Sequence, residues 1–352
     1  MRTAAILTNR IYAWDDTNRL AVGGGERVIL RVCSLLKSRG YEVTIYQYAQ
    51  RAFEHNLDGI NIVGLPYPTS NYDMFWPLIC NQFYNRTKMS DFVLYNLPDF
   101  ATGKKRDDAV LFVQGTVWCG VPPSELTKHQ KATLRNVFDE MKTNVIVHEY
   151  TRDAMRQIGA ADAADRAICI ENYVDCEVFV PAEKQKIILF PGQAEKVKGI
   201  SLLEEVLPRL RFDGWRVVWC GSGPEYGRLQ EMAEKYEWFS VTSYPMDQVQ
   251  AAYGPASICV ALNLRSRGNS LTMMEGMACE CACVGIEGNT TLLVDGDNGV
   301  LCEPNADSLV GAIARLVAEE DLRLSLGKRA RADMAERYSL SDWRDKWTKI
   351  LA

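Results

Sequence analysis

The first half of the chain alternates short apolar runs with apolar residues at helical spacing. Between the first two runs, apolar positions from Val28 to Leu36 recur every three or four residues, and Gly40 marks the end of that segment. Strands that alternate with helices in this way predict a parallel sheet with helices on both faces. Six runs have the length and composition of buried strands: residues 4–7, 42–46, 61–65, 92–95, 110–113 and 144–147.

The second half repeats this pattern. Its polar segment from Pro181 to Lys186 is the best candidate for a linker. The sequence therefore predicts an α/β protein of two doubly wound, Rossmann-like domains, whose ligands bind in a cleft at the carboxyl ends of the strands. Strands are expected at residues 187–190, 216–220, 257–262 and 281–286, and helices at 202–210, 226–236 and 271–279.

Composition and charge narrow the class of protein. The 352 residues are 47% hydrophobic and 24% charged, which suits a globular protein with two cores. A net charge of -5 argues against a general nucleic-acid binder. No apolar run approaches the roughly 20 residues that span a bilayer, and the apolar start of the chain runs straight into polar Thr8, which predicts a strand and not a signal peptide. We expect a cytoplasmic protein, with peripheral association at the inner face of the membrane left open.

Two features could be mistaken for metal sites. The chain has eleven cysteines, an odd number without paired metal-type spacing, and Cys281 and Cys283 would share one face of a strand, so we expect buried free thiols. The acidic segment 295–299 contains Asp-Gly and Asn-Gly steps, which are strong turn signals. We therefore expect a turn there, no metal, and no cofactor.

The segment 267–279 carries the strongest signal for a binding site. Gly268 and Ser270 precede an apolar helical stretch, an arrangement that directs backbone amides and the positive end of the helix dipole at a phosphate. Glu275 lies five residues beyond Ser270, where its carboxylate can accept hydrogen bonds from a ribose diol. The pattern indicates a nucleoside diphosphate sugar. The alternative is an amphipathic helix capped by Ser270 with a solvated Glu275.

This segment resembles the signature of the family 4 retaining glycosyltransferases, which have the two-domain GT-B fold. In that family two glutamates stand eight positions apart, the first near hydroxyls of the donor sugar and the second near the ribose. The second is Glu275, but Arg267 holds the first position and cannot accept a hydrogen bond from a hydroxyl. The resemblance implies that the donor site includes Arg267, Asn269, Ser270, Leu271 and Thr272.

Two earlier loops support the resemblance. The run Gly23-Gly24-Gly25-Glu26-Arg27 matches the Gly-Gly-x-Glu-Arg loop, which in the family faces the donor phosphate and the acceptor. The resemblance therefore implies that Gly24 and Gly25 belong to the binding site, although a turn that only reverses the chain would use the same glycines. In the loop after residue 191 the family has an arginine and a lysine that neutralise the diphosphate. Lys198 fits the lysine, with a solvated surface lysine as the alternative, and the uncharged Gln193 replaces the arginine.

Four more residues bear on the site, and three of them, Gly221, Gln114 and His148, directly follow expected strands. Gly221 opens a Gly-Ser-Gly-Pro loop that would let the nucleotide approach the sheet edge, and Tyr244 falls where relatives line the base pocket, with a core aromatic as an equal alternative. Gln114 stands where many relatives place a histidine near the transferred sugar, so the resemblance implies a catalytic set of Gln114, Lys198 and Glu275. For His148, where a serine is usual, a packed or solvated side chain is the simpler interpretation.

The resemblance as a whole implies a retaining, metal-independent glycosyltransferase that uses a nucleoside diphosphate sugar and a saccharide or lipid-linked hydroxyl acceptor in glycan or glycolipid assembly. It implies an N-terminal acceptor-side domain over 1–182, a nucleotide-sugar domain over 183–337 and a helix over 338–352 that returns towards the first domain. Arg267 and Gln193 keep open a catalytically silent GT-B protein that binds a nucleotide or a partner. An epimerase or phosphorylase would need a general acid or cofactor lysine that the sequence does not place.

Overall fold

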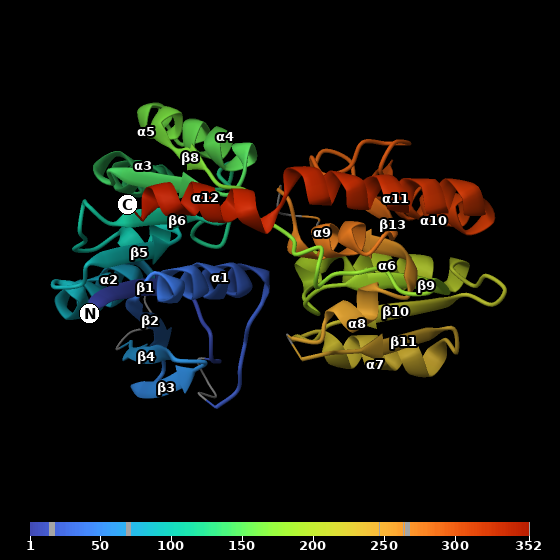
Figure 1. Ribbon diagram of the computed structural model, residues 1–352, viewed down its shortest axis with the longest axis horizontal. Coiled ribbons are helices and arrows are strands. Elements are labelled where there is room, and N and C mark those ends of the chain that lie inside the picture. Colours follow the sequence, from blue (N-terminus) through green and yellow to red (C-terminus); the bar gives the residue numbers. More distant parts are fainter. Residues whose placement is uncertain (14–17, 68–71, 246, 263, 265–267, 352) are drawn as a thin grey trace. The chain divides into compact units, whose positions relative to one another are not determined.

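The computed structural model describes residues 1–351 except 14–17, 68–71, 246, 263 and 265–267. The chain divides into two compact units, one of residues 1–171 and 346–352 and the other of residues 172–345 (Figure 1). The division lies between Glu171 and Asn172, and the segment 181–186 belongs to the second unit. No helix among the described residues is long and apolar enough to cross a membrane.

The first unit is built on an eight-stranded sheet in the order β3-β4-β2-β1-β5-β6-β7-β8. Only β3 runs antiparallel to its neighbour. All six strands expected in this half are present, whereas β3 and β8 were not predicted, because β3 is a half-exposed edge and β8 has two residues. The strands are β1 Arg2–Thr8, β2 Tyr41–Ala49, β3 Phe53–Leu57, β4 Ile60–Pro66, β5 Phe92–Asn96, β6 Val110–Val113, β7 Thr143–Ile146 and β8 Ile168–Cys169.

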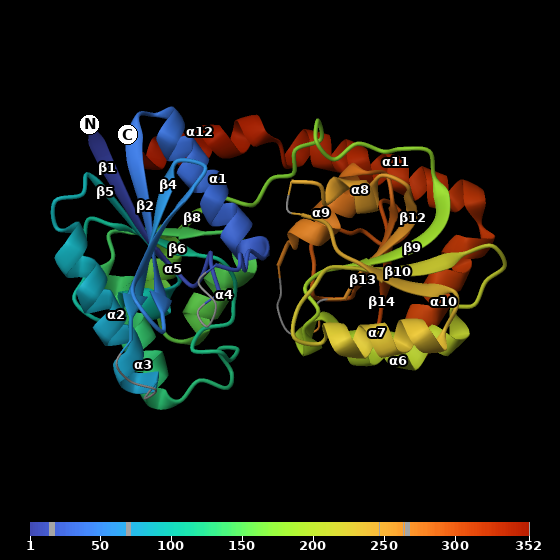
Figure 2. The same ribbon diagram turned by 90° about the horizontal axis from the view of Figure 1, so that it is seen from below.

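Helices cover both faces of this sheet (Figure 2). Along β6, Leu111 and Val113 join the core beneath α2 and α3, while Phe112 points to the other face and meets Trp347 of α12 edge-on at 5.1 Å between ring centroids. Trp343, one turn earlier in α12, belongs to the second unit and packs against Tyr173 within that unit. The helices are α1 Gly24–Ser38, α2 Tyr72–Thr87, the short η1 Pro98–Ala101, α3 Lys128–Glu140, α4 Glu149–Gln157, α5 Ala161–Arg166 and α12 Leu340–Ile350.

The second unit is a six-stranded, fully parallel sheet in the order β11-β10-β9-β12-β13-β14. The four strands expected in this half are present, and β11 and β14 were not predicted. Cys281 and the β13 residue Cys283 are buried free thiols, as the sequence predicts. The strands are β9 Gln185–Pro191, β10 Arg216–Cys220, β11 Phe239–Thr242, β12 Ala256–Ala261, β13 Ala282–Ile286 and β14 Val300–Cys302.

In this unit α6, α7 and α10 cover one face of the sheet, and α8, α9 and α11 the other (Figure 2). The helix expected over 202–210 is α6 followed by a separate 3-10 turn, because Pro208 has no amide to continue the helix. The helices are α6 Ile200–Val206, α7 Tyr226–Lys235, α8 Gln250–Tyr253, α9 Leu271–Ala278, α10 Ala306–Ala318, α11 Glu320–Arg337 and the short η2 Lys196–Lys198 and η3 Leu207–Arg209.

The acidic segment 295–299 is a turn, as its sequence predicts. Gly296 has a φ of +76° and its amide donates to the carbonyl of Gly299 at 2.9 Å. The Asp295 carboxylate accepts from the amide of Leu301 at 2.9 Å, and Asn298 is buried and donates to the Asp333 carboxylate at 2.7 Å. The polar side chains of this segment therefore stabilise the turn and attach it to α11.

Candidate functional site

The start of α9 is an anchored helix N-terminus in the second unit. Ser270 caps it, since its Oγ accepts a hydrogen bond from the amide of Met273 at 3.2 Å. Gly268, with a φ of +137°, donates its amide to the carbonyl of Asn289 at 3.0 Å, and the Asn269 side chain accepts from the Thr291 hydroxyl at 3.2 Å. Gly268 and Asn269, directly before the helix, are thus held on the segment after β13, so the first amides of α9 have a fixed direction.

Glu275 lies in the second turn of this helix and is completely buried. Its interpretation as a solvated helix residue is therefore wrong. Burial, with a smaller contribution from the negative charge of Glu275, raises the pKa of the Cys220 thiol to about 12. Because Cys220 is the last residue of β10, the carboxylate lies close to the carboxyl end of that strand, where Gly221 follows.

The loops after β9 and β10 are bonded to each other at this same edge of the sheet. The amide of Ala194 donates to the carbonyl of Ser222 at 2.9 Å, and the amide of Gly192 donates to Cys220 at 2.9 Å. Gly221 has a φ of +142°, and a Cβ added there would lie 2.0 Å from the carbonyl oxygen of Gly192. Packing between the two loops therefore requires a glycine at this position, independently of any ligand. Gln193 lies between Gly192 and Ala194 and is half-buried.

Lys198 ends η2, directly after this pair of loops. It is half-buried, unlike the exposed Lys196 in the same turn. Burial lowers the pKa of Lys198 from its ordinary value, against an opposing effect of Glu195. Gly199 follows in the left-handed region at a φ of +79° and packs against Leu262, just after β12. Lys198 is thus a partly desolvated cation near the strand ends, which is the setting in which an anionic ligand binds most strongly.

A small cavity of about 10 Å³, enough for roughly one water molecule, opens beside the start of α9. It lies at the carboxyl ends of β12 and β13, between Ala261 and Gly285 on the strands and Ser270 on the helix. The remaining lining residues are Gly268, Met273, Ile286, Asn289 and Thr290. In parallel α/β sheets this edge is the one where ligands bind.

Of two other residues predicted for this site, the structure describes Tyr244 but not Arg267. Tyr244 follows β11 and is 41% exposed, so its interpretation as a core aromatic is wrong. Its role as a base contact stays a prediction. Arg267, with the neighbouring Arg265, lies outside the described residues. Among the described residues, no group of three or more histidine, cysteine, aspartate or glutamate side chains could hold a metal.

In the first unit, Gln114 belongs to a chain of side-chain hydrogen bonds across three strand ends. Its Nε2 donates to Oδ1 of Asn96 at 2.8 Å, and Nδ2 of Asn96 donates to the Thr8 hydroxyl at 2.8 Å. Gln114 follows the last residue of β6, Asn96 ends β5 and Thr8 ends β1. Sequence reasoning missed Asn96 and Thr8 because nothing in their local pattern separates them from ordinary strand-end residues.

The glycine loop at the start of α1 lies next to this chain. A Cβ added to Gly25 would lie 3.6 Å from Oε1 of Gln114. Gly24 and Gly25 are exposed. The Glu26 carboxylate accepts a hydrogen bond from the amide of Gly23 at 2.9 Å. One amide that the glycine loop could offer to an anion is therefore already bound to a carboxylate of the chain itself.

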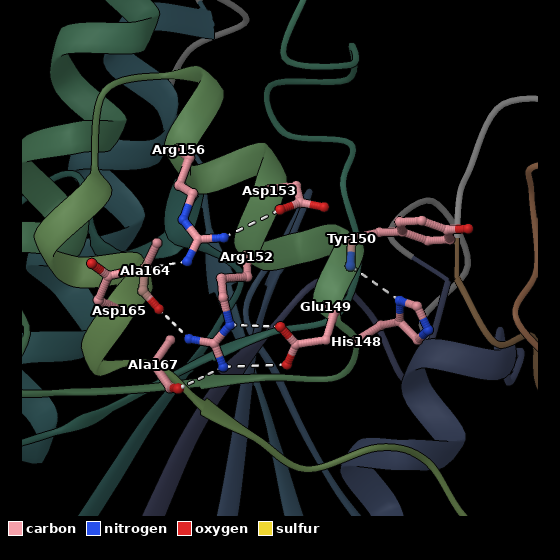
Figure 3. A network of polar contacts seen from close by, with 9 residues as sticks. All are labelled: His148, Glu149, Tyr150, Arg152, Asp153, Arg156, Ala164, Asp165 and Ala167. Carbon is pink, nitrogen blue, oxygen red and sulfur yellow. Dashed lines mark hydrogen bonds and ion pairs between the residues drawn. The ribbon is translucent and has the colours of Figure 1, made fainter.

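His148 is a helix cap at the start of α4 (Figure 3). Its Nδ1 accepts from the amide of Tyr150 at 3.1 Å, and burial lowers the pKa of its imidazole below the ordinary 6.5. Its Nε2 lies 3.9 Å from a carboxylate oxygen of Glu171. On the same helix, Arg152 pairs with Glu149 at 2.7 Å and donates to carbonyls of α5 and the residue after it (Figure 3). The packed interpretation of His148 suits this geometry.

Residues 176–333 match the family model described as Glycosyl transferases group 1. This match lies within the second unit and includes α9 and the loops after β9 and β10. Amylovoran biosynthesis glycosyltransferase AmsD of Erwinia amylovora is 20% identical over 342 residues, which cover 92% of this chain and 95% of that protein. The chain spans half or less of the length of three further curated relatives that it matches.

Solved structures share the fold along the whole chain. Sucrose-phosphate synthase from Thermosynechococcus elongatus superposes with a TM-score of 0.80 at 13% identity, covering 100% of this chain and 98% of that one. Anabaena Alr3699/HepE in complex with UDP-glucose gives a TM-score of 0.77 at 11% identity, covering 100% and 99%. The predicted GT-B fold, with two Rossmann-like domains, is confirmed.

Proposed function

We propose that this protein is a retaining glycosyltransferase that moves a sugar from a nucleoside diphosphate sugar to a hydroxyl acceptor. One observation carries the proposal: the fully buried carboxylate of Glu275 lies one turn behind a helix N-terminus that Ser270 caps and that an anchored loop holds in place. A helix N-terminus binds phosphate through its amides and dipole. A carboxylate just behind it suits the ribose diol of the same nucleotide.

The roles of the residues follow from their charges. The amides of Leu271 and Thr272 bind the diphosphate, Lys198 stabilises the charge that grows on it as the anomeric carbon–oxygen bond breaks, and Gln193 donates a neutral hydrogen bond. The acceptor oxygen forms the new bond on the same face of the sugar and its proton passes to the leaving phosphate. With a lysine and a helix N-terminus balancing the phosphate charge, this mechanism does not require a metal ion.

Comparison with known proteins supports the donor class. Residues 176–333 of the second unit match the family model of the group 1 glycosyl transferases, and Anabaena Alr3699/HepE, of the same fold, was crystallised in complex with UDP-glucose. The name of the Erwinia relative refers to amylovoran biosynthesis. We extend the proposal to a saccharide or lipid-linked acceptor in glycan assembly, bound by the first unit, with peripheral membrane association for a lipid-linked acceptor.

A panel of ligands tests the proposal. Calorimetric titration with UDP, GDP and ADP should give saturable binding for at least one nucleotide. A release assay with UDP-glucose, UDP-N-acetylglucosamine, GDP-mannose and ADP-glucose should then show slow donor hydrolysis with the same base. A chain that binds no nucleoside diphosphate contradicts the proposal.

A catalytically silent GT-B protein is the second candidate, favoured by the uncharged Gln193 where the resembling family has an arginine. It predicts nucleotide binding without hydrolysis of any donor in the panel, with or without added saccharides. Restoring the missing charge by Gln193→Arg should leave such a protein inactive, whereas an active transferase should bind the diphosphate more tightly.

Arg267 gives the proposal a finer form, since its guanidinium pairs with a carboxylate or with a diphosphate. If it recognises a carboxylate on the donor sugar, the protein should prefer UDP-glucuronic acid to UDP-glucose, and Arg267→Glu should reverse this preference. If it binds the diphosphate, Arg267→Ala should weaken UDP binding without changing sugar preference. An Arg267→Ala variant that changes neither is evidence for a solvated surface arginine.

A further inference from the structure

The carboxyl end of α9 is bound by a lysine ammonium. Nζ of Lys184 donates to the carbonyl of Cys279, the C-cap residue of the helix, at 2.6 Å. The same Nζ donates to the carbonyls of Ala256 at 2.8 Å and Gly254 at 3.1 Å. Lys184 is half-buried, and it forms no ion pair with a carboxylate that the structure describes. A positive charge bound by neutral carbonyls therefore lies at the negative end of the helix dipole.

A second cation holds this end of the helix in place. Arg331 of α11 donates to the carbonyl of Ala278, the last residue of α9. Its guanidinium also donates to the carbonyls of Phe179 at 2.9 Å and Cys176 at 3.0 Å. The helix packs in addition against β12, β13 and α11. Its position is therefore fixed by more than the bonds of Lys184.

The helix between this ammonium and the phosphate-binding end is buried. Seven of the eight residues of α9 are buried, and a Cβ added to Gly276 would lie 2.6 Å from Sγ of Cys259 on β12. Charges in such surroundings interact over longer distances than charges in water, because solvent and salt screen them less. A helix of this length spans only about 12 Å. The charge of Lys184 is therefore felt at the other end of α9.

The buried thiols around the helix end respond to this charge. Burial raises the pKa of the Cys279 thiol to about 12, and the positive charge of Lys184 opposes this rise. Burial also raises the pKa of the Cys283 thiol on β13, and Lys184 opposes that rise as well. The field of the ammonium therefore extends from the end of α9 to the strand beneath the helix.

We propose that the ammonium of Lys184 strengthens phosphate binding at the N-terminus of α9 from the opposite end of the helix, through its charge and without contact with the ligand. It offsets the negative end of the helix dipole, which would otherwise repel the phosphate groups. The inference rests on the proposed function, in which the amides of Leu271 and Thr272 bind the diphosphate. All these groups belong to the second unit, so nucleotide binding without an acceptor tests it.

Lys184→Gln tests the charge, because glutamine keeps a donor for the carbonyls and removes the positive charge. We expect the dissociation constant of the preferred nucleoside diphosphate of the panel to rise about tenfold, an effect of the size that one unit charge has at such a distance in a partly buried setting. The rise should be smaller for the corresponding monophosphate and absent for the nucleoside, because the negative charge decreases in that order. Calorimetric titration measures all three constants, with displacement for the weaker ligands.

Two further variants separate charge from structure. Lys184→Arg keeps the charge and should bind all three ligands nearly as the native protein does. Lys186→Gln removes the same charge from an exposed lysine two residues later, where solvent and salt screen it, and should change none of the three constants. A displaced helix would act differently: Glu275, the proposed ribose contact, lies in α9, so its displacement would weaken the nucleoside as much as the diphosphate.

Folding is checked in the same variants. Lys184→Gln should lower the melting temperature, since fewer of the buried carbonyls keep a donor, and the titrations are made well below that temperature. Lys184→Met, which fills a similar volume without charge, serves as the neutral variant where the glutamine protein does not fold.

The outcomes are distinguishable. A neutral Lys184 variant that binds the diphosphate as Lys186→Gln does, or that loses the same factor for all three ligands, overturns the inference and leaves the proposed function intact. A native protein that binds no nucleoside diphosphate, or binds it no better than the nucleoside, contradicts the proposed function, and the inference fails with it.

Discussion

The two units have the same kind of sheet but different chemistry at the carboxyl ends of their strands. In the second unit these ends carry charge: the half-buried Lys198, the buried Glu275 and the N-terminus of α9. In the first unit they carry neutral side chains, of which Asn96 and Gln114 are bonded in series. A doubly wound fold supplies an edge where ligands bind, and the side chains at that edge decide whether it suits a diphosphate or hydroxyl groups.

The glycines of the two units differ in the same way. Gly221 is enclosed by the backbone of the neighbouring loop, whereas Gly25 faces a side-chain oxygen across ordinary contact distance and is exposed. The first is needed to build the site and the second leaves room beside it. Glycines that look alike in sequence therefore have opposite tolerance for a methyl group.

The largest expected effect tests this contrast inside the second unit. Gly221→Ala combines a strained φ with an overlap on Gly192, and we expect it to lower the free energy of unfolding by more than about 4 kcal/mol. Gly192→Ala is the matched variant, because Gly192 has a similar φ of +147° but nothing within 4 Å of its Cβ position. It should cost only about 1 to 3 kcal/mol. Denaturant unfolding of both variants measures these losses in the free energy of unfolding. Equal losses would show that backbone strain alone, without the overlap, destabilises Gly221→Ala.

A substitution of Lys198 tests whether the positive charge at the strand ends of the second unit contributes to donor hydrolysis. Lys198→Ala should lower kcat for donor hydrolysis by about 10² to 10³-fold, as removal of one stabilising group for a developing charge does elsewhere, with a smaller effect on nucleotide affinity. Lys196→Ala, an exposed lysine in the same turn, should change little. A Lys198→Ala variant with only a raised KM would contradict its role at the leaving group.

The smallest effect concerns the histidine cap of the first unit. Burial lowers the pKa of His148, so below its ordinary 6.5 the unfolded chain takes up a proton that the folded chain resists. The folded state should therefore lose stability as the pH falls from 6.5 towards the lowered pKa, and protonation of Nδ1 would also remove the cap. His148→Asn keeps a cap that does not titrate.

Unfolding measured at about pH 7.5 and about pH 5.5 should show a smaller loss for His148→Asn than for the native chain. His148→Ala should be about 1 kcal/mol less stable than His148→Asn at the higher pH, since the cap is gone. Identical pH dependence in native and His148→Asn chains would mean that His148 does not titrate differently on folding.

Much of the fold could be predicted because it depends on local pattern. Buried strands of parallel sheets are continuous apolar runs, and the cap at Ser270 is a local signal, so both were found. The edge strand β3 and the two-residue β8 were not predicted, because exposed or very short strands have no such pattern. Pro208, which ends α6 early, was visible in the sequence but was outweighed by the apolar spacing around it.

The candidate site was less predictable because its properties arise from contacts between distant residues. Glu275 could be named from its place in the helix, but its complete burial depends on the packing of α9 against β12 and β13 of the sheet. The link from Gln114 to Asn96 joins residues 18 positions apart on adjacent strands. Nothing in the local sequence indicates such a bond.

Calorimetric titration of the Glu275→Ala variant with the preferred nucleoside diphosphate tests the central claim most directly. Loss of a charged acceptor for the ribose diol should weaken binding by about 1.5 to 3 kcal/mol, while the matched 2′,3′-dideoxy nucleotide should bind the native and variant proteins alike. The melting temperature of the variant, and of the shape-preserving Glu275→Gln, identifies any loss that comes from unfolding. An unchanged dissociation constant for the natural nucleotide in a folded Glu275→Ala protein would remove Glu275 from the site and contradict the account.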